Sequence, residues 1–239
     1  MIRNAQYYIK LVRNLLDDED KPNVAGTFWS DVEIAVELDN AQYEVINYLY
    51  ANKLYNYLQG LIKHIDIDLR YVPLVTTGYY EYTELPNDFL HALSAGFIYT
   101  YGLQNDYNYN LPILRKIDIQ WNDVADPYTF GSKSTHAISI SGDGIMRIYR
   151  DSYDNTTDPH MVRLVYVRKP DLFMNNLDNY GELINYNPII YDAIAFLASA
   201  FLMIKDNMEG KKFYSLYSQS LLTLSLVAKQ KDYFAIFSK

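Results

Sequence analysis

The chain has 239 residues and a mass of 27.9 kDa, and its 49% hydrophobic and 21% charged residues are typical of a globular protein rather than a disordered one. A formal net charge of −8 argues against a protein that grips nucleic acid, because phosphate binding draws on clustered Lys and Arg, although an acidic wall that repels passing DNA fits this charge. The chain has no cysteine, which excludes disulfides, thiolate catalysis and cysteine-based zinc sites.

Tyrosine is unusually frequent, with 25 residues, and aromatic residues make up 15% of the chain. A tyrosine side chain combines a large contact area with a polar tip, so it suits half-wet surfaces between subunits. Codon bias in an AT-rich genome is the alternative explanation, since Asn is plentiful too. The two explanations do not exclude each other.

The first elements in the chain are predicted to be helices. Residues 2–16 place apolar side chains at helical spacing, and a loop follows over residues 17–28. Ser30 and Glu33 form a capping-box pattern, which predicts a helix from there to about Lys63. This helix is apolar on two sides, so we expect it to lie between neighbours: one side carries Leu38, Val45 and Leu49, and the other repeats by sevens through Val36, Tyr43, Tyr50 and Tyr57.

The middle of the chain carries the signals of β structure. Residues 71–76 and 79–85 predict a hairpin, and Pro86 predicts a third helix that runs to about Leu103, with Asp88 as a cap in its first turn. A polar loop is expected over residues 105–110. Strands are then expected at residues 113–121, 136–141, 145–149 and 162–167, separated by long loops at 123–135 and 151–159.

Two helices are predicted to close the chain. Pro188 begins the first, which runs to Ile204 with hardly any polar face and is therefore expected to be the innermost helix. The second covers residues 210–228, and the short connection predicts an antiparallel pair. The segment 229–239 is too apolar to prefer water, so we expect it to bind a partner, with folding back onto its own helices as the alternative. Its anchors are Tyr233, Phe234, Ile236 and Phe237.

These elements predict an α+β fold, namely a helical bundle with a long central helix and an inserted antiparallel β region. Residues 1–110 and 170–239 would form the bundle core, including the hairpin at 71–85, and residues 111–169 would form the β insertion. The N-terminus lacks the unbroken apolar run of a signal peptide, and the longest apolar stretch is too short to span a bilayer, so no contact with a membrane is expected.

Candidate chemistry in the sequence is sparse. The patterns GxSxG, HExxH, GxxxxGK[ST] and GxGxxG do not occur, and the four histidines have no paired spacing. His64, Asp66 and Asp68 would share one face of a strand and could converge on a cation, but a loop with exposed carboxylates is the favoured interpretation. A second acidic group lacks the calcium-loop pattern: Asp151, Asp154 and Asp158. We therefore expect no catalytic residue, no metal and no cofactor.

The order of several short phrases resembles the head-to-tail connector proteins of tailed bacteriophages, also called adaptor or ring proteins. The phrases are VRNLLD at 12–17, FWSD at 28–31, NAQ at 40–42, YTELPNDFL at 82–90, VYVRKP at 165–170 and YDAIA at 191–195. The YTELPNDFL phrase is similar to the "ELPxDF" phrase with which such proteins begin a middle helix. The resemblance spans nearly the whole chain, although none of these phrases is catalytic.

The resemblance implies a non-enzymatic structural subunit of the phage neck, made in the host bacterial cytoplasm and present in the virion. It further implies a homo-oligomeric ring, usually twelvefold, between the portal protein and further ring or tail proteins, with genomic DNA passing through the lumen. The C-terminal segment would reach a groove between portal subunits. The Tyr and Asn content suggests the crAss-like phages. Two other classes stay open: a phage-associated lytic or metal-dependent enzyme, and a soluble scaffolding or host-interaction module.

Overall fold

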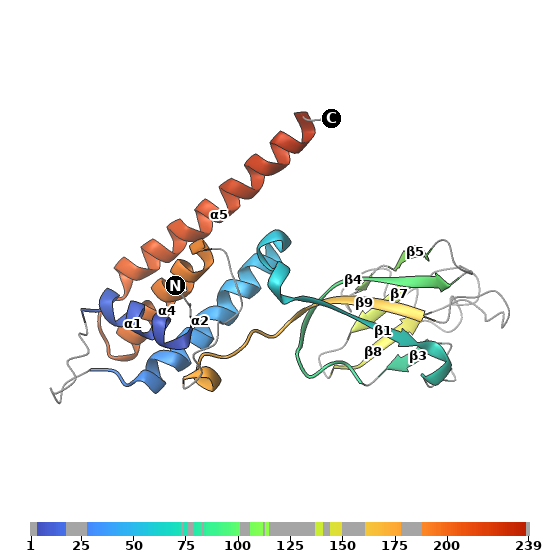
Figure 1. Ribbon diagram of the computed structural model, residues 1–239, viewed down its shortest axis with the longest axis horizontal. Helices are drawn as coiled ribbons and strands as arrows, with labels where there is room; N and C mark the ends of the chain where they lie inside the picture. The colour runs from blue at the N-terminus through green and yellow to red at the C-terminus, as the bar shows by residue number, and fades with distance from the viewer. Residues whose placement is uncertain are drawn as a thin grey trace. The chain divides into compact units, whose positions relative to one another are not determined.

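The computed structural model describes residues 4–17, 28–72, 74–75, 79–82, 84–100, 106–111, 113–114, 137–140, 144–149, 161–177 and 188–237. It combines helices with mainly antiparallel sheets, so the fold is mixed α+β (Figure 1). The chain forms two compact units: residues 1–61 with 170–239 form a helical unit, and residues 62–169 form a β unit. The first division therefore falls at residue 61 rather than near 110, because the strands from residue 62 onward pair within the β unit.

The helical unit begins with two helices whose starts are fixed by side-chain caps. Helix α1 (Ala5–Leu15) is capped by Asn4, whose side chain accepts a hydrogen bond from the backbone N–H of Tyr7. Helix α2 (Asp31–Ala51) has the predicted capping box, in which Ser30 and Glu33 each satisfy the other's backbone amide. The helix at the N-terminus and the start of α2 are thus confirmed.

Helix α2 ends at Ala51, so its predicted extension to about Lys63 is wrong. The chain leaves the helix through a Schellman motif, in which Lys53 adopts a left-handed conformation (φ 58°) and the N–H of Leu54 donates to the carbonyl of Leu49. Two short 3-10 turns follow, η1 (Tyr55–Tyr57) and η2 (Gln59–Leu61), and the β unit begins at Ile62.

Helix α4 (Pro188–Lys205) is the innermost element of the helical unit, as predicted from its missing polar face. It contacts α1 and α2, and helix α5 (Lys211–Phe237) runs along it. The α4 residues that are buried in this core include Ile190, Tyr191, Ala193, Ile194, Leu197 and Leu202. Phe201 is only half-buried, because it lies toward a groove described below.

A buried carboxylate holds the segment that returns from the β unit. Asp39 of α2 is 9% exposed, and its two oxygens accept hydrogen bonds from the backbone N–H groups of Phe173 (2.7 Å) and Met174 (3.2 Å). The Phe173 ring then packs edge-on against Tyr8, which in turn stacks on Tyr191. Asp39 thereby fixes the return segment to the helical core.

The β unit consists of two sheets. The first has the strand order β1 (Ile62–Asp68), β9 (Met161–Arg168), β4 (Phe89–Thr100) and β5 (Asp106–Leu111), and all its neighbours are antiparallel. The second has the order β2 (Leu74–Val75), β3 (Tyr79–Tyr82), β8 (Met146–Tyr149), β7 (Ala137–Ile140) and β6 (Ile113–Leu114). One buried cluster draws on both sheets: Ile67, Leu69, Ala95, Ile138, Met146, Ile148, Val162 and Leu164.

The paired strands agree with the predicted hairpins at 71–85 and 136–149 and with the strand at 162–167. The turn of the first hairpin and the loops at 123–135 and 151–159 lie outside the described residues. Of the strand expected at 113–121, the structure describes only β6. The predicted polar loop at 105–110 is wrong, because strand β5 occupies this segment and pairs with β4.

The predicted third helix from Pro86 to about Leu103 is also wrong, because residues 89–100 form strand β4. Its apolar residues fit a helical period as well as a strand, but pairing with β9 on one side and β5 on the other decides for the strand. Asp88 therefore caps no helix. Its carboxylate accepts hydrogen bonds from Lys63 Nζ (2.7 Å) and the Tyr166 hydroxyl (3.0 Å), which joins three segments of the first sheet.

Candidate interaction surface

The turn between α4 and α5 sets the direction of the last helix. Helix α4 ends in a second Schellman motif, with Asn207 in a left-handed conformation (φ 58°) and the N–H of Met208 donating to the carbonyl of Met203. A side chain at Gly210 would place its Cβ 3.0 Å from the carbonyl oxygen of Ala200, so glycine permits the close approach of the two helices. Helix α5 therefore returns along α4.

One face of α5 belongs to the core of the helical unit. Phe213, Leu221 and Leu224 are buried. Two tyrosines of the α2 side add polar contacts to this face: the Tyr57 hydroxyl donates to the carbonyl of Leu224, and the Tyr48 hydroxyl lies 3.3 Å from Ser225 Oγ.

The opposite face of α5 is apolar and exposed. Leu222 is 60% exposed and Leu226 is 54% exposed. At about 100° per residue, these two leucines lie on the side of the helix away from Leu224. We call Leu222, Leu226 and the helix positions in line with them the outer face of α5.

Helix α5 is longer than the helix it packs on. It has 27 residues against 18 in α4, which corresponds to about 13 Å of additional helix at ~1.5 Å per residue. The two helices are antiparallel and joined by a short turn, so this excess lies at the C-terminal end, where the ribbon continues past α4 (Figure 1). The predicted end of the helix near Ala228 is therefore wrong, because the backbone stays helical to Phe237.

The predicted anchor residues fall on these last turns, although their side chains lie outside the described residues. By helical periodicity the positions of Tyr233, Ile236 and Phe237 lie within about 60° of Leu222, in line with the outer face. Phe234 falls on a different side, about 120° from Leu222. Three of the four predicted positions therefore continue the row begun by Leu222 and Leu226.

A groove of about 530 Å³ lies in the helical unit between α2, α4 and the first turn of α5. Its apolar and aromatic part consists of Phe201, Ile204, Tyr43 and Tyr214, of which Ile204 is 49% exposed and Tyr214 38% exposed. The remaining lining is polar: Glu37, Asn40, Glu44 and Lys205. Of the seven-residue repeat predicted as a second apolar side of α2, Tyr43 lines this groove, and Val36, one repeat earlier, is 41% exposed.

Electrostatics at the groove favour a basic ligand. Lys205 lies 3.6 Å from Glu33, so its charge is already engaged, whereas Glu37 accepts a hydrogen bond only from the neutral amide of Asn40 among the described contacts. Beside the groove, burial and then the negative charge of Glu44 raise the pKa of Tyr217 to about 12. Burial, helped by the charge of Asp39, also raises the pKa of Tyr43. Both phenols therefore stay protonated at neutral pH.

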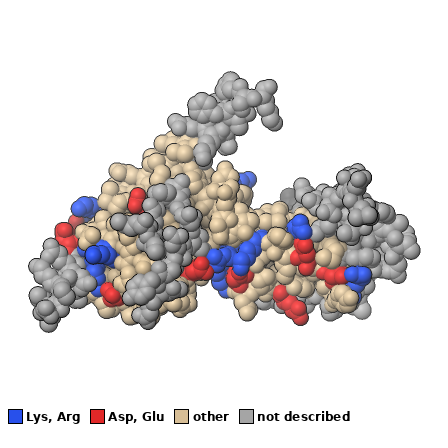
Figure 2. Space-filling view, viewed as in Figure 1, with Lys and Arg blue, Asp and Glu red and all other residues tan. Residues whose placement is uncertain are grey.

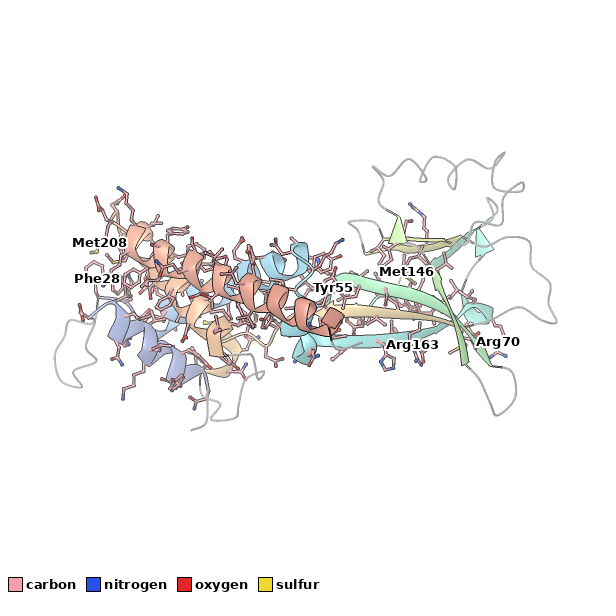
Figure 3. The ribbon with its side chains drawn as sticks, turned by 90° about the horizontal axis from the view of Figure 1, so that it is seen from above. Phe28, Tyr55, Arg70, Met146, Arg163 and Met208 are labelled. Carbon is pink, nitrogen blue, oxygen red and sulfur yellow. The ribbon has the colours of Figure 1, made fainter. Side chains whose placement is uncertain are left out.

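A smaller exposed apolar group lies at the α4–α5 turn. Phe28 is 60% exposed and Met208 is 39% exposed, and Figure 3 shows both at the same end of the helical unit. Nearby, Trp29 Nε1 donates to the Asp206 carboxylate and so joins the start of α2 to the α4–α5 turn. In the view of Figure 2, uncharged residues predominate over the drawn face of this unit.

The acidic residues singled out in the sequence do lie on a strand rather than in a loop. His64, Asp66 and Asp68 alternate along β1, an edge strand, but both carboxylates face a guanidinium group. Arg163 makes two hydrogen bonds to Asp66, at 2.7 and 2.8 Å. The Arg70 side chain makes three to Asp68, at 3.0, 3.1 and 2.6 Å. Figure 3 labels Arg163 and Arg70 on this unit.

The bonds from Arg163 lower the pKa of Asp66, as expected for a paired carboxylate. Within the described part of the chain no group of three or more His, Asp or Glu side chains is placed to hold a metal ion. Asp151, Asp154, Asp158, His136 and His160 lie outside it. Figure 2 shows acidic and basic residues side by side on the β unit, in keeping with these pairs.

Sequence reasoning placed a partner site at the C-terminal end but missed Leu222, Leu226 and the groove. The signal for the leucines was present, because apolar residues at 221 and 222 and again at 224 and 226 cannot all share one face of a helix. The groove could not be predicted, since it depends on how α2, α4 and α5 pack.

No family model matches the sequence, and no curated protein is similar to it at a significant level. Among the described residues, no helix is long and apolar enough to cross a membrane.

Proposed function

We propose that the chain is a structural subunit of a phage neck, where copies of it form a ring between the portal and the tail through which DNA passes. The observation that carries the proposal is the outer face of α5, where Leu222 and Leu226 are more than half exposed on a helix whose opposite face is buried. A helix that is apolar on both sides is suited to lie between two neighbours.

Two further features support a subunit that is built to associate. The helical unit also has the groove between α2, α4 and α5, and the outer face and the groove are separate surfaces. One subunit can therefore contact two neighbours at once. Repeated contacts between two different surfaces produce rings when the rotation closes.

The sequence phrases that resemble connector proteins take part in the packing. Arg13 and Asp31, which belong to the first two phrases, form an ion pair at 2.6 Å with the Arg13 side chain almost fully buried. The phrase at 165–170 lies on β9 and its end, and the phrase at 191–195 lies in α4. The phrase at 82–90 departs from the pattern, because it precedes strand β4 rather than a helix.

The charge of the chain suits a conduit. A net charge of −8 repels DNA and so favours its passage without sequence-specific contact. The helical bundle with a long central helix, as such proteins are expected to have, remains part of this proposal. The proposal also includes the portal as the partner of the last turns of α5, and the virion as the location of the protein.

An assembly experiment tests the proposal. Heads would be isolated from a phage in which the gene for this chain has been disrupted, and purified protein would be added back before tails. We expect the protein to bind at one vertex, to appear as a ring in electron micrographs, and to restore tail attachment. Heads that attach tails and become infectious equally well without the protein would contradict the proposal.

A further inference from the structure

We propose that the groove between α2, α4 and α5 receives the outer face of α5 from a second copy of this chain. In this contact Leu222 and Leu226 lie on the apolar part of the groove, and the next helix position in line with them, that of Lys229, comes toward its carboxylates. The inference deepens the proposed ring function and rests on it, because it names the two surfaces through which neighbouring subunits meet.

The groove has the chemistry of a site for a basic, apolar helix. Phe201 and Ile204 supply apolar surface, and Glu37 and Glu44 stand on the same side of α2. Because the two glutamates are seven residues apart, they are separated by about 10.5 Å along the helix. The cation at the edge of the groove, Lys205, already lies against Glu33 at 3.6 Å.

The outer face of α5 matches this arrangement. Leu222, Leu226 and Lys229 fall within about 60° of one another by helical periodicity. An apolar pair followed by a cation thus faces an apolar patch flanked by carboxylates.

Charge favours the same pairing. Helix α5 contains four lysines, at 211, 212, 229 and 231, and one acidic residue, Asp232, so its formal charge is +3 in a chain of net charge −8. The acidic groove and the basic helix are therefore electrostatically complementary, which steers association and disfavours pairing of α5 with another α5.

A subunit cannot fill its own groove with this face. Phe213, Leu221 and Leu224 anchor the opposite side of α5 in the core, and α5 follows α4 through the tight turn at Gly210. The outer face consequently points away from the core of its own subunit and has to meet a different copy. The contact joins two unlike surfaces, so it propagates from copy to copy until the ring closes.

Cross-linking tests the contact. The chain has no cysteine of its own, so a maleimide reagent couples only the cysteines that are introduced. The full chain with both Glu44→Cys and Leu226→Cys would be treated with a short bismaleimide. We expect a ladder of covalent oligomers, because each copy carries both partners of the contact. A mixture of the two single variants should give dimers only. A double variant with Glu84→Cys in place of Glu44→Cys is the matched control, since Glu84 is exposed on the β unit, and it should give no ladder.

Charge reversal is the second measurement. In sedimentation velocity, Lys229→Glu and Glu44→Arg should each weaken self-association at least tenfold, and the two together in one chain should restore most of it. Glu84→Arg should leave it unchanged. Dimers from Leu226→Cys alone, or association that survives Glu37→Arg with Glu44→Arg, would overturn the inference in favour of pairing between two α5 helices.

The outcomes separate this inference from the proposed function. Rings that form normally when the groove is reversed in charge would overturn the groove contact and leave the ring function standing. Protein that neither cross-links nor forms rings on isolated heads would overturn both.

Discussion

The carboxylate of Asp39 offers the most direct test of how the return segment is held to the helical core. It accepts two backbone hydrogen bonds, from Phe173 at 2.7 Å and Met174 at 3.2 Å, and it is 9% exposed. Hydrogen bonds to a charged group contribute about 1.5–3 kcal/mol each, and burial of the carboxylate offsets part of this. We therefore expect Asp39→Ala to lower the free energy of unfolding by about 2–4 kcal/mol.

Urea denaturation followed by circular dichroism measures this loss. Asn40→Ala is the matched control, because Asn40 is the next residue on α2, is exposed and bonds only to the Glu37 side chain among the described contacts. It should change the free energy of unfolding by no more than about 0.5 kcal/mol. Asp39→Asn keeps one acceptor oxygen and should fall between the two. A loss for Asp39→Ala as small as that of the control would show that these two hydrogen bonds do not hold the return segment.

The pH dependence of Asp39 has a definite sign. Burial raises the pKa of Asp39 above 3.8 despite the two hydrogen bonds that lower it. The folded state then binds the proton more tightly than the unfolded state, so this contribution to stability is present below the unfolded pKa and is lost as pH rises through the folded pKa. Relative to Asp39→Asn, the wild type should lose stability as pH increases across that window. A difference that grows in favour of the wild type would contradict the assignment.

Four further predictions follow from the described contacts. Leu197→Asp places a charge at a position that is 2% exposed in α4 and should cost about 3–5 kcal/mol, whereas Leu197→Met should cost less than about 1.5 kcal/mol in the same urea titration. Asp66→Asn removes the negative charge and one of the two acceptor oxygens that face Arg163, and it should cost only about 0.5–1 kcal/mol, less at high salt, because the pair is partly exposed. The pKa of Asp88 is lowered, chiefly by the hydrogen bond from a lysine, so its stabilising contribution is present above the unfolded pKa and is lost as pH falls through the folded pKa. Asp88→Asn should therefore flatten the acid limb of the pH–stability curve. An unchanged limb would contradict this. Truncation after Ala228 should shift the melting temperature by less than about 2 °C yet abolish attachment to portal-bearing heads, and a shift of many degrees would mean that the last turns belong to the subunit's own core.

Local signals in the sequence were sufficient where the chain itself satisfies its backbone. Ser30 and Glu33 close the capping box at the start of α2 without help from distant residues, and the pattern was readable for that reason. The end of α2 could not be predicted, because Lys53 is an uncommon residue for the left-handed position that a Schellman motif requires. Nothing in its side chain marks a helix end.

Tertiary pairing decided the elements that were predicted wrongly. Residues 89–100 are apolar at positions that suit a helix, yet as β4 they form the strand between β9 and β5. The partners that fix this choice lie far away in the chain, at residues 161–168 on one side. Asp66 and Asp68 likewise could be placed on one face of a strand from their spacing, but Arg163, which neutralises Asp66, could be identified only from the fold.

The candidate interaction surface, too, could be predicted only in part from the sequence. The apolar C-terminal residues were visible in the sequence, and helical periodicity now aligns Tyr233, Ile236 and Phe237 with exposed Leu222 and Leu226. That alignment required knowing that α5 continues to Phe237 and which of its sides is buried. The groove could not be predicted from the sequence, because it forms only where three helices pack together.

Native mass spectrometry of the purified full chain, combined with electron microscopy of the same sample, measures whether its copies assemble into a ring. We expect a closed ring whose mass is an integer multiple of 27.9 kDa and whose formation depends on Leu222 and Leu226. A protein that stays monomeric at every concentration, both alone and on portal-bearing heads, would contradict it.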